Sequence, residues 1–161
     1  MGVRECEAGL ILDNGIGYRW HSVERNNDET MVFDVPAELR HKLANIVNGA
    51  DMFERRSPAK PCPHDVGSQF LFLARHNVSS GRLAQCAQPE RHELTNSGFY
   101  TLASTFTQRL DSVHSGELPG RRIDFNTMTQ GVRDYLGKLP AGDLRKVEVN
   151  SWLDTVTRAM P

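Results

Sequence analysis

The sequence predicts a small single-domain α+β protein: an antiparallel sheet with helices on one face and a helical C-terminal layer. Three observations support this class. The chain has 161 residues, 39% of them are hydrophobic, and hairpin patterns fill its first part while helical patterns dominate its last. A chain of this length buries roughly two thirds of its unfolded surface, so it can form a core without a disulfide or a metal. We expect the order β-β-β-α-β-β-α, followed by helices.

The strongest local signal is the Asp-Asn-Gly segment 13–15, which separates the apolar run 10–12 from the alternating segment 16–23. An Asn-Gly step tolerates positive φ at both turn positions, so these segments are predicted to form a tight hairpin. Alternation then assigns the side chains of the second strand to two faces, with Ile16, Tyr18 and Trp20 on one and Arg19 and His21 on the other.

The next elements follow the same two periodicities. Residues 30–35 alternate as a strand, and Pro36 opens a helix that ends at Gly49. Residues 69–75 form a strand that is apolar on both faces, and residues 82–87 are expected to return antiparallel to it. The longest helix is predicted over residues 94–114.

The last part of the chain is mainly helical. A helix capped by Asp124 or Asn126 is predicted to end at Gly137, and residues 151–160 form a final helix. Residues 145–149 fit a short strand or a helical turn equally well. The first of these helices should turn four side chains inward, namely Met128, Val132, Tyr135 and Leu136. We therefore expect one domain over residues 1–161, with an α+β core at 1–116 and a helical segment at 117–161 packed on it.

Charge argues against a nucleic-acid partner. The formal net charge is -1, and charged residues make up 24% of the chain. Proteins that bind DNA or RNA through phosphates usually carry a basic patch. The compact basic pairs, Arg55-Arg56 and Arg121-Arg122, are interpreted as solvated loop ends. No apolar stretch is long enough to cross a membrane, so we expect a soluble protein, and its compartment stays open.

The cysteines allow several interpretations. A disulfide between Cys62 and Cys86 would tie the proline-rich segment 55–67 to the following strands and contribute about 3 kcal/mol in the loop-entropy picture. Separate reduced thiols are the alternative. A zinc site with His64 and His92 is disfavoured, because a Cys-x-His pair is too short for the usual chelate spacing. A Cys–His nucleophile is also disfavoured, since no catalytic signature surrounds any cysteine.

These observations favour binding over catalysis, with no cofactor and no metal. The segment 55–67 has three prolines and no periodicity, and long ordered loops often carry function. We expect a protein-binding module of the inhibitor or immunity type, whose partner is an enzyme or a toxin. A small thiol- or histidine-dependent hydrolase and an accessory subunit of a larger assembly are the alternatives. The predicted partner surface combines this loop with the exposed side of strand 16–23, through Arg19, His21, Arg55, Arg56 and His64.

Overall fold

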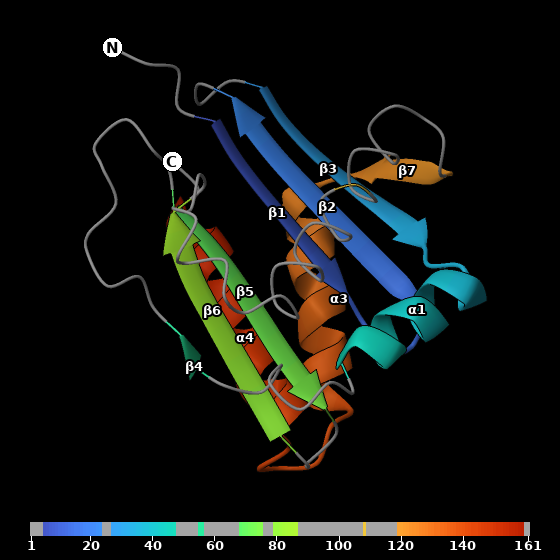
Figure 1. The fold of residues 1–161 in the computed structure, drawn as a ribbon. Coiled ribbons are helices and arrows are strands. Elements are labelled where there is room, and N and C mark those ends of the chain that lie inside the picture. Colours follow the sequence, from blue (N-terminus) through green and yellow to red (C-terminus); the bar gives the residue numbers. More distant parts are fainter. Residues whose placement is uncertain are drawn as a thin grey trace.

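A computed structural model gives the fold of the chain over residues 5–23, 27–47, 55–56, 68–75, 79–86, 108 and 119–159. Figure 1 shows its strands and helices. In chain order these elements are β1 (Glu5–Ile11), β2 (Ile16–Val23), β3 (Asn27–Asp34), α1 (Ala37–Val47), β4 (Arg55–Arg56), β5 (Ser68–Arg75), β6 (Ser79–Cys86), β7 (Gly120–Ile123), α3 (Phe125–Gly137) and α4 (Leu144–Ala159).

The structure has antiparallel strands together with separate helices, which confirms the α+β class. The strands form two sheets. The larger sheet has the order β1-β2-β3-β7, and all of its neighbouring strands are antiparallel. The smaller sheet has the order β4-β6-β5, in which β5 and β6 are antiparallel and β4 is parallel to β6. The predicted antiparallel pairing of the strands in the 70s and 80s is therefore confirmed.

The predicted hairpin is present between β1 and β2. Gly15 has a φ of 89°, and its N–H donates to the carbonyl of Leu12 at 3.1 Å. The N–H of Ile16 donates to Oδ1 of Asn14 at 3.0 Å, so the asparagine side chain closes the turn on the local backbone. Positive φ costs glycine little, which explains its place at this corner.

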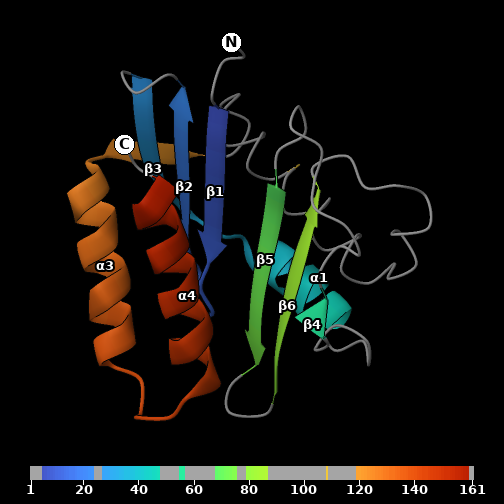
Figure 2. The same cartoon turned by 90° about the vertical axis from the view of Figure 1, so that its left-hand side faces the viewer.

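Helices α3 and α4 cover one face of the larger sheet (Figure 2). Trp20 of β2 meets Phe125, the first residue of α3, with ring centroids 6.0 Å apart and an edge-to-face angle of 64°. Helix α4 also packs against β5 and β6, and Phe72 of β5 contacts the same core. The predicted inward residues of α3 lie in this core, although Tyr135 is only half-buried.

Helix α1 packs on the opposite face of the larger sheet, at one end. Phe33, Val35 and Leu39 form a second, smaller core there. Gly17 of β2 lies directly opposite Phe33 in the register, and the phenyl ring fills the space above it. The two cores therefore lie on the two faces of one sheet.

Three parts of the sequence interpretation need correction or completion. The pair Arg121-Arg122 is not a loop end, because residues 120–123 form β7 and pair with β3. The pair Arg55-Arg56 likewise forms β4. Residues 145–149, which fitted either strand or helix, are part of α4. The predicted helix 94–114, except for Gln108, and the proline-rich residues 57–67 lie outside the described residues.

Within the parts of the chain that the structure describes, no helix is long and apolar enough to cross a membrane.

Candidate functional site

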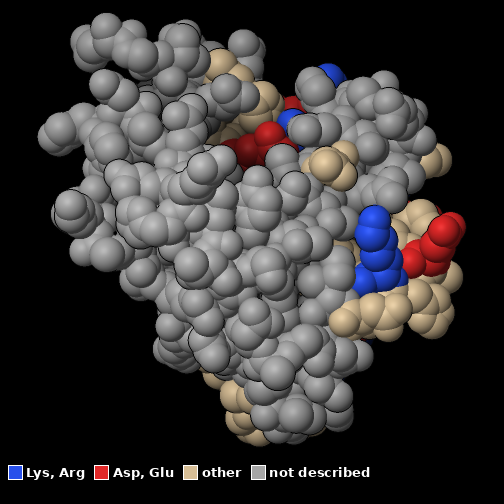
Figure 3. Space-filling model, viewed as in Figure 1, with Lys and Arg blue, Asp and Glu red and all other residues tan. Residues whose placement is uncertain are grey.

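The face of the larger sheet opposite α3 and α4 carries side chains of alternating charge across its four strands. Nε of Arg19 lies 3.5 Å from Oε1 of Glu7, and Nη1 of Arg19 lies 3.7 Å from Oε1 of Glu29. Nη2 of Arg122 lies 2.8 Å from Oε2 of Glu29. These four residues come from β1, β2, β3 and β7, so we call them the cross-strand ladder. Figure 3 views this face and shows acidic and basic atoms together in a recess over the larger sheet.

The ladder explains why Arg19 is buried, although the sequence predicts it on the exposed side of strand 16–23. Alternation places it correctly on the face opposite Trp20, but its side chain is not exposed. Arg19 is 2% exposed, and its Nε and Nη1 atoms make no hydrogen bond although both lie within ion-pair distance of carboxylates. A buried guanidinium needs such opposite charges to offset its desolvation. Arg19 is therefore an internal member of the ladder.

His21 lies on the same face, half-buried, in register between Glu7 of β1 and Glu29 of β3. The two basic residues predicted from strand 16–23 thus share one face of the larger sheet. The other predicted partner residues do not join them in the described structure. Arg55 and Arg56 belong to the smaller sheet, and nothing is described of their side chains.

His64 and Cys62 lie outside the described residues, and so does the side chain of Cys86. The Cys62–Cys86 disulfide and the roles of these side chains stay predictions. Cys6, a half-buried residue of β1, is a free thiol.

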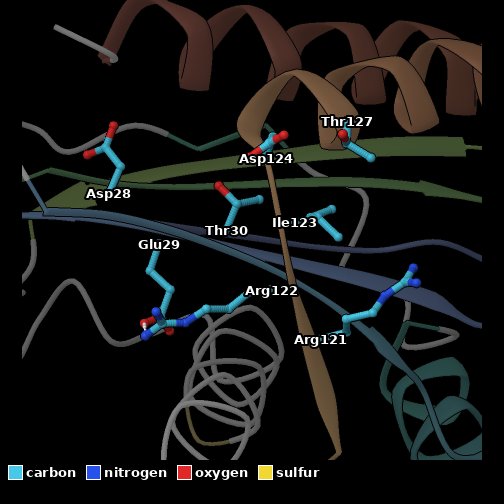
Figure 4. Close-up of a pocket in the computed structure, with 8 residues that line it drawn as sticks. All are labelled: Asp28, Glu29, Thr30, Arg121, Arg122, Ile123, Asp124 and Thr127. Carbon is cyan, nitrogen blue, oxygen red and sulfur yellow. Dashed lines mark hydrogen bonds and ion pairs between the residues drawn. The ribbon is translucent and has the colours of Figure 1, made fainter.

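An open pocket of about 750 Å³ lies beside the end of the ladder, where β3 begins and α3 starts. Its lining comes from residues 28–30 of β3, residues 121–123 of β7, and Asp124 and Thr127 at the N-terminus of α3 (Figure 4). We call it the edge pocket, because β7 is an outer strand of the larger sheet.

The lining side chains divide between the two sides of the sheet. Because successive residues of a strand point to opposite faces, Asp28 and Thr30 lie on the helix side and Glu29 lies on the ladder side. Figure 4 shows Asp124 and Thr127 on the same side as Asp28 and Thr30. The pocket therefore has a helix side with carboxylate and hydroxyl oxygens, which Arg121 shares because it pairs with Val32, and a ladder side made by the Glu29–Arg122 pair.

Among the described residues, the side chains of Asp28, Thr30 and Asp124 make no hydrogen bond or ion pair. Asp124 is the N-cap of α3, yet its side chain makes no capping hydrogen bond. Asp28 and Thr30 likewise make no side-chain hydrogen bond or ion pair in the structure as described. Thr30 is 5% exposed as a residue, but its hydroxyl oxygen is not among the buried side-chain atoms that lack a hydrogen-bond partner, so it reaches the solvent of the pocket. The helix side thus presents solvent-accessible carboxylate and hydroxyl oxygens to the pocket.

A second polar cluster joins the hairpin turn to the helical layer. The phenol of Tyr135 donates to Oδ1 of Asp13 at 2.7 Å, and Nη1 of Arg145 lies 2.6 Å from Oδ2 of Asp13. Arg145 also binds Asp143 through Nε and Nη2, at 3.1 and 2.8 Å. The backbone N–H of Arg145 donates to Oδ1 of Asp143 at 2.9 Å, so Asp143 caps α4. This cluster fixes the turn against the helices.

Tyr135 makes stability depend on pH. Burial, and then the hydrogen bond to Asp13 and the charge of that carboxylate, raise the pKa of Tyr135 above its ordinary value of 10.0. The folded protein therefore holds the phenolic proton more tightly than the unfolded chain. The stability that this difference contributes is complete below pH 10.0 and is lost as the pH rises beyond it.

We accordingly expect the free energy of unfolding to fall as the pH rises above about 10, and to fall less steeply in Tyr135→Phe. Urea unfolding of both proteins at a series of pH values measures the two slopes. Tyr18, whose pKa burial also raises, is present in both proteins, so the difference between the two slopes reports on Tyr135. Equal slopes in the two proteins would contradict the role given to Tyr135.

The chemistry of the edge pocket is that of a polar binding surface. Its lining offers carboxylates, hydroxyls and guanidinium groups, and none of its eight residues is a cysteine or a histidine. Among the described side chains, no group of three or more His, Cys, Asp or Glu residues could hold a metal ion.

Sequence reasoning did not select the pocket residues. Asp28 and Glu29 lie just before the strand predicted over residues 30–35, Arg121 and Arg122 are interpreted as a solvated loop end, and Asp124 is predicted only as a helix cap. The basic pair did indicate this region, because it ends two residues before the capping Asp124. It could not indicate that β7 pairs with β3, which brings these segments together.

No family model, no curated protein and no solved structure matches this chain.

Proposed function

We propose that this protein is a binding module that recognises a partner protein at the edge pocket. The observation that supports this most is the group of unpartnered polar side chains on the helix side of the pocket, Asp28, Thr30 and Asp124. Carboxylate and hydroxyl oxygens that meet at one concave place can accept hydrogen bonds from a ligand. A partner that supplies hydrogen-bond donors there would replace the water that these oxygens bind in the free protein.

The shape and composition of the pocket favour a protein ligand. Sites for small molecules are mostly apolar and enclose the ligand. The edge pocket is open, and Ile123 is the one apolar residue among those that line it. Polar, open surfaces with arginines at the edge resemble the rims of protein–protein interfaces. Arg121 and Arg122 are both exposed and stand beside the opening.

An inhibitor or immunity-type role is the form of binding that we propose, in which the module blocks an enzyme or a toxin. An accessory subunit would use the same surface without blocking its partner. The two differ in one measurement, since only an inhibitor lowers the activity of the protein that it binds.

Site-specific photo-crosslinking in the source cells tests the location. A photoreactive amino acid is placed at position 121, beside the edge pocket, or at position 133 on the exposed part of α3. Both positions hold an exposed arginine, so the two variants lose the same charge. We expect a discrete crosslinked protein with position 121 and not with position 133.

The crosslinked protein is then identified by mass spectrometry and purified. Binding at the edge pocket predicts that unlabelled wild-type protein competes the crosslink away. Equal crosslinking from both positions, or none from position 121 in cells that produce the protein, would refute the proposal.

A further inference from the structure

We infer that Asn14 is a covalent modification site, which loses ammonia to become aspartate or isoaspartate when the turn between β1 and β2 opens. We call residues 12–16 the hairpin corner, and we infer that its contacts set the rate of this reaction. The inference goes beyond the proposed function, because it concerns the hairpin corner and not the edge pocket. Asn14 directly precedes Gly15 and is exposed to water, and asparagine is among the chemically labile residues of proteins.

The reaction uses only the chain and water. The backbone nitrogen of Gly15 attacks Cγ of Asn14, so a bond forms between these two atoms and the bond from Cγ to Nδ2 breaks. Nδ2 leaves as ammonia and takes the proton of the Gly15 amide with it. Water then opens the resulting five-membered ring at either carbonyl, which gives aspartate or isoaspartate. Glycine allows the attack because no side chain stands beside the reacting nitrogen.

In the closed corner both reacting groups are engaged in other hydrogen bonds. The N–H of Gly15 donates to the carbonyl of Leu12 at 3.1 Å, and Oδ1 of Asn14 accepts the N–H of Ile16 at 3.0 Å. The nitrogen that must lose its proton is thus already a donor, and the carboxamide that must turn toward it is held by a residue further along. Both bonds have to break before the attack, so the closed corner protects the asparagine.

Contacts with distant segments hold the corner closed. The carbonyl of Gly15 accepts the N–H of Val35 at 2.8 Å, which ties the corner to the segment before α1. Asp13 accepts the phenol of Tyr135 at 2.7 Å and pairs with Arg145 at 2.6 Å, which ties the corner to α3 and α4. Loop tips open locally more easily than the strands that they join. These contacts therefore decide how often the asparagine is released for reaction.

The isoaspartate product cannot rebuild the corner. Its backbone runs through the former side chain and has one more atom before Gly15, so the bonds of Gly15 to Leu12 and Val35 lose their register. The aspartate product keeps an oxygen that can accept the N–H of Ile16, so the corner can close again. The isoaspartate fraction thus converts a transient opening of the hairpin corner into a lasting one.

Incubation of the purified protein at neutral pH and physiological temperature measures the reaction, with mass spectrometry of its peptides as the readout. The aspartate and isoaspartate peptides are heavier than the original and separate by chromatography. We expect Asn14 to react at least about tenfold more slowly in the folded protein than in urea, because the corner is mostly closed. Asn48 also precedes a glycine and lies outside the described residues, so it calibrates the urea sample, in which both asparagines should react at similar rates.

Matched variants test whether the corner sets the rate. Tyr135→Phe removes one contact of Asp13 and should speed the reaction of Asn14 by about threefold or more, the effect of one hydrogen bond on a local opening. Val156→Ala is the control, because it removes buried methyl groups near the opposite end of α4 and should leave the rate unchanged. Asn14→Asp gives the blank, since it has no ammonia to lose.

Equal rates for Asn14 in the folded protein and in urea would overturn the inference. No reaction in the folded protein, over a period many times longer than the urea sample needs, would also overturn it. An equal acceleration by Tyr135→Phe and Val156→Ala would show that global unfolding, and not the corner, sets the rate. None of these results bears on partner binding at the edge pocket, which crosslinking from position 121 tests separately.

Discussion

Replacing Arg145 with methionine is expected to lower the free energy of unfolding by about 3–5 kcal/mol, the usual effect of removing one partner of a buried ion pair. Asp143 is 0% exposed, and the Arg145 guanidinium binds both of its oxygens. Methionine keeps the apolar stem but not the charge, so the buried carboxylate would lose both guanidinium contacts of Arg145. The variant also loses the contact from α4 to Asp13 in the hairpin turn.

Removing the charge of Asp143 instead should lower the free energy of unfolding less than replacing Arg145. In Asp143→Asn the side-chain oxygen can still accept the N–H of Arg145, so the cap of α4 survives. In this variant Arg145 keeps its ion pair with Asp13, and its side chain, which is 17% exposed, also contacts water. Urea unfolding of both variants at neutral pH measures the difference. A loss below about 0.5 kcal/mol in Arg145→Met, the range of a neutral surface change, would show that the pair does not hold the cluster together.

The second large effect is expected at Gly17. A Cβ atom added there would lie 2.4 Å from two carbons of the Phe33 ring, closer than real Cβ contacts allow. Phe33 cannot move away easily, because it is buried with Val35 and Leu39 beneath α1. We expect Gly17→Ala to lower the free energy of unfolding by about 1–3 kcal/mol.

A double-mutant cycle identifies the cause of that loss. Phe33→Leu shortens the ring side chain, so Gly17→Ala should cost at least about 1 kcal/mol less in the Phe33→Leu background than in the wild type. Chemical unfolding of the four proteins gives the coupling energy. Additive losses would mean that the ring is not what excludes a side chain at position 17.

The sequence predicted those elements whose signals are local. The Asn-Gly turn depends on φ preferences of adjacent residues, and Gly15 adopts the positive φ that this pattern indicates. Met128, Val132 and Leu136 repeat at helical spacing and are buried in α3 as predicted. These patterns need no knowledge of the rest of the chain.

Features that depend on contacts between distant segments were not predicted. β7 is four residues long and contains two consecutive arginines, so it lacks the alternation that indicates a strand. Residues 120–123 form a strand because they pair with β3, which lies about ninety residues earlier in the chain. Arg19 shows the same limit, since alternation gave its face but not the carboxylates of Glu7 and Glu29 that accompany its burial.

The edge pocket could not be predicted for the same reason. Asp28 and Thr30 come from the start of β3, and Asp124 follows β7, so the pocket exists only once those strands pair. The missing capping bond of Asp124 is also invisible in the sequence, because an aspartate before a helix predicts a satisfied cap.

The most direct test of the edge pocket as the binding site is crosslinking from position 121 in the source cells, in the wild-type background and in Asp28→Asn/Asp124→Asn. The proposal predicts one discrete crosslinked protein in the wild-type background and a clearly lower yield of it in the double variant, whose fold should be unchanged because both carboxylates are exposed and unpaired in the described structure. A crosslink of equal yield in both backgrounds, or one that arises equally from position 133, would contradict it.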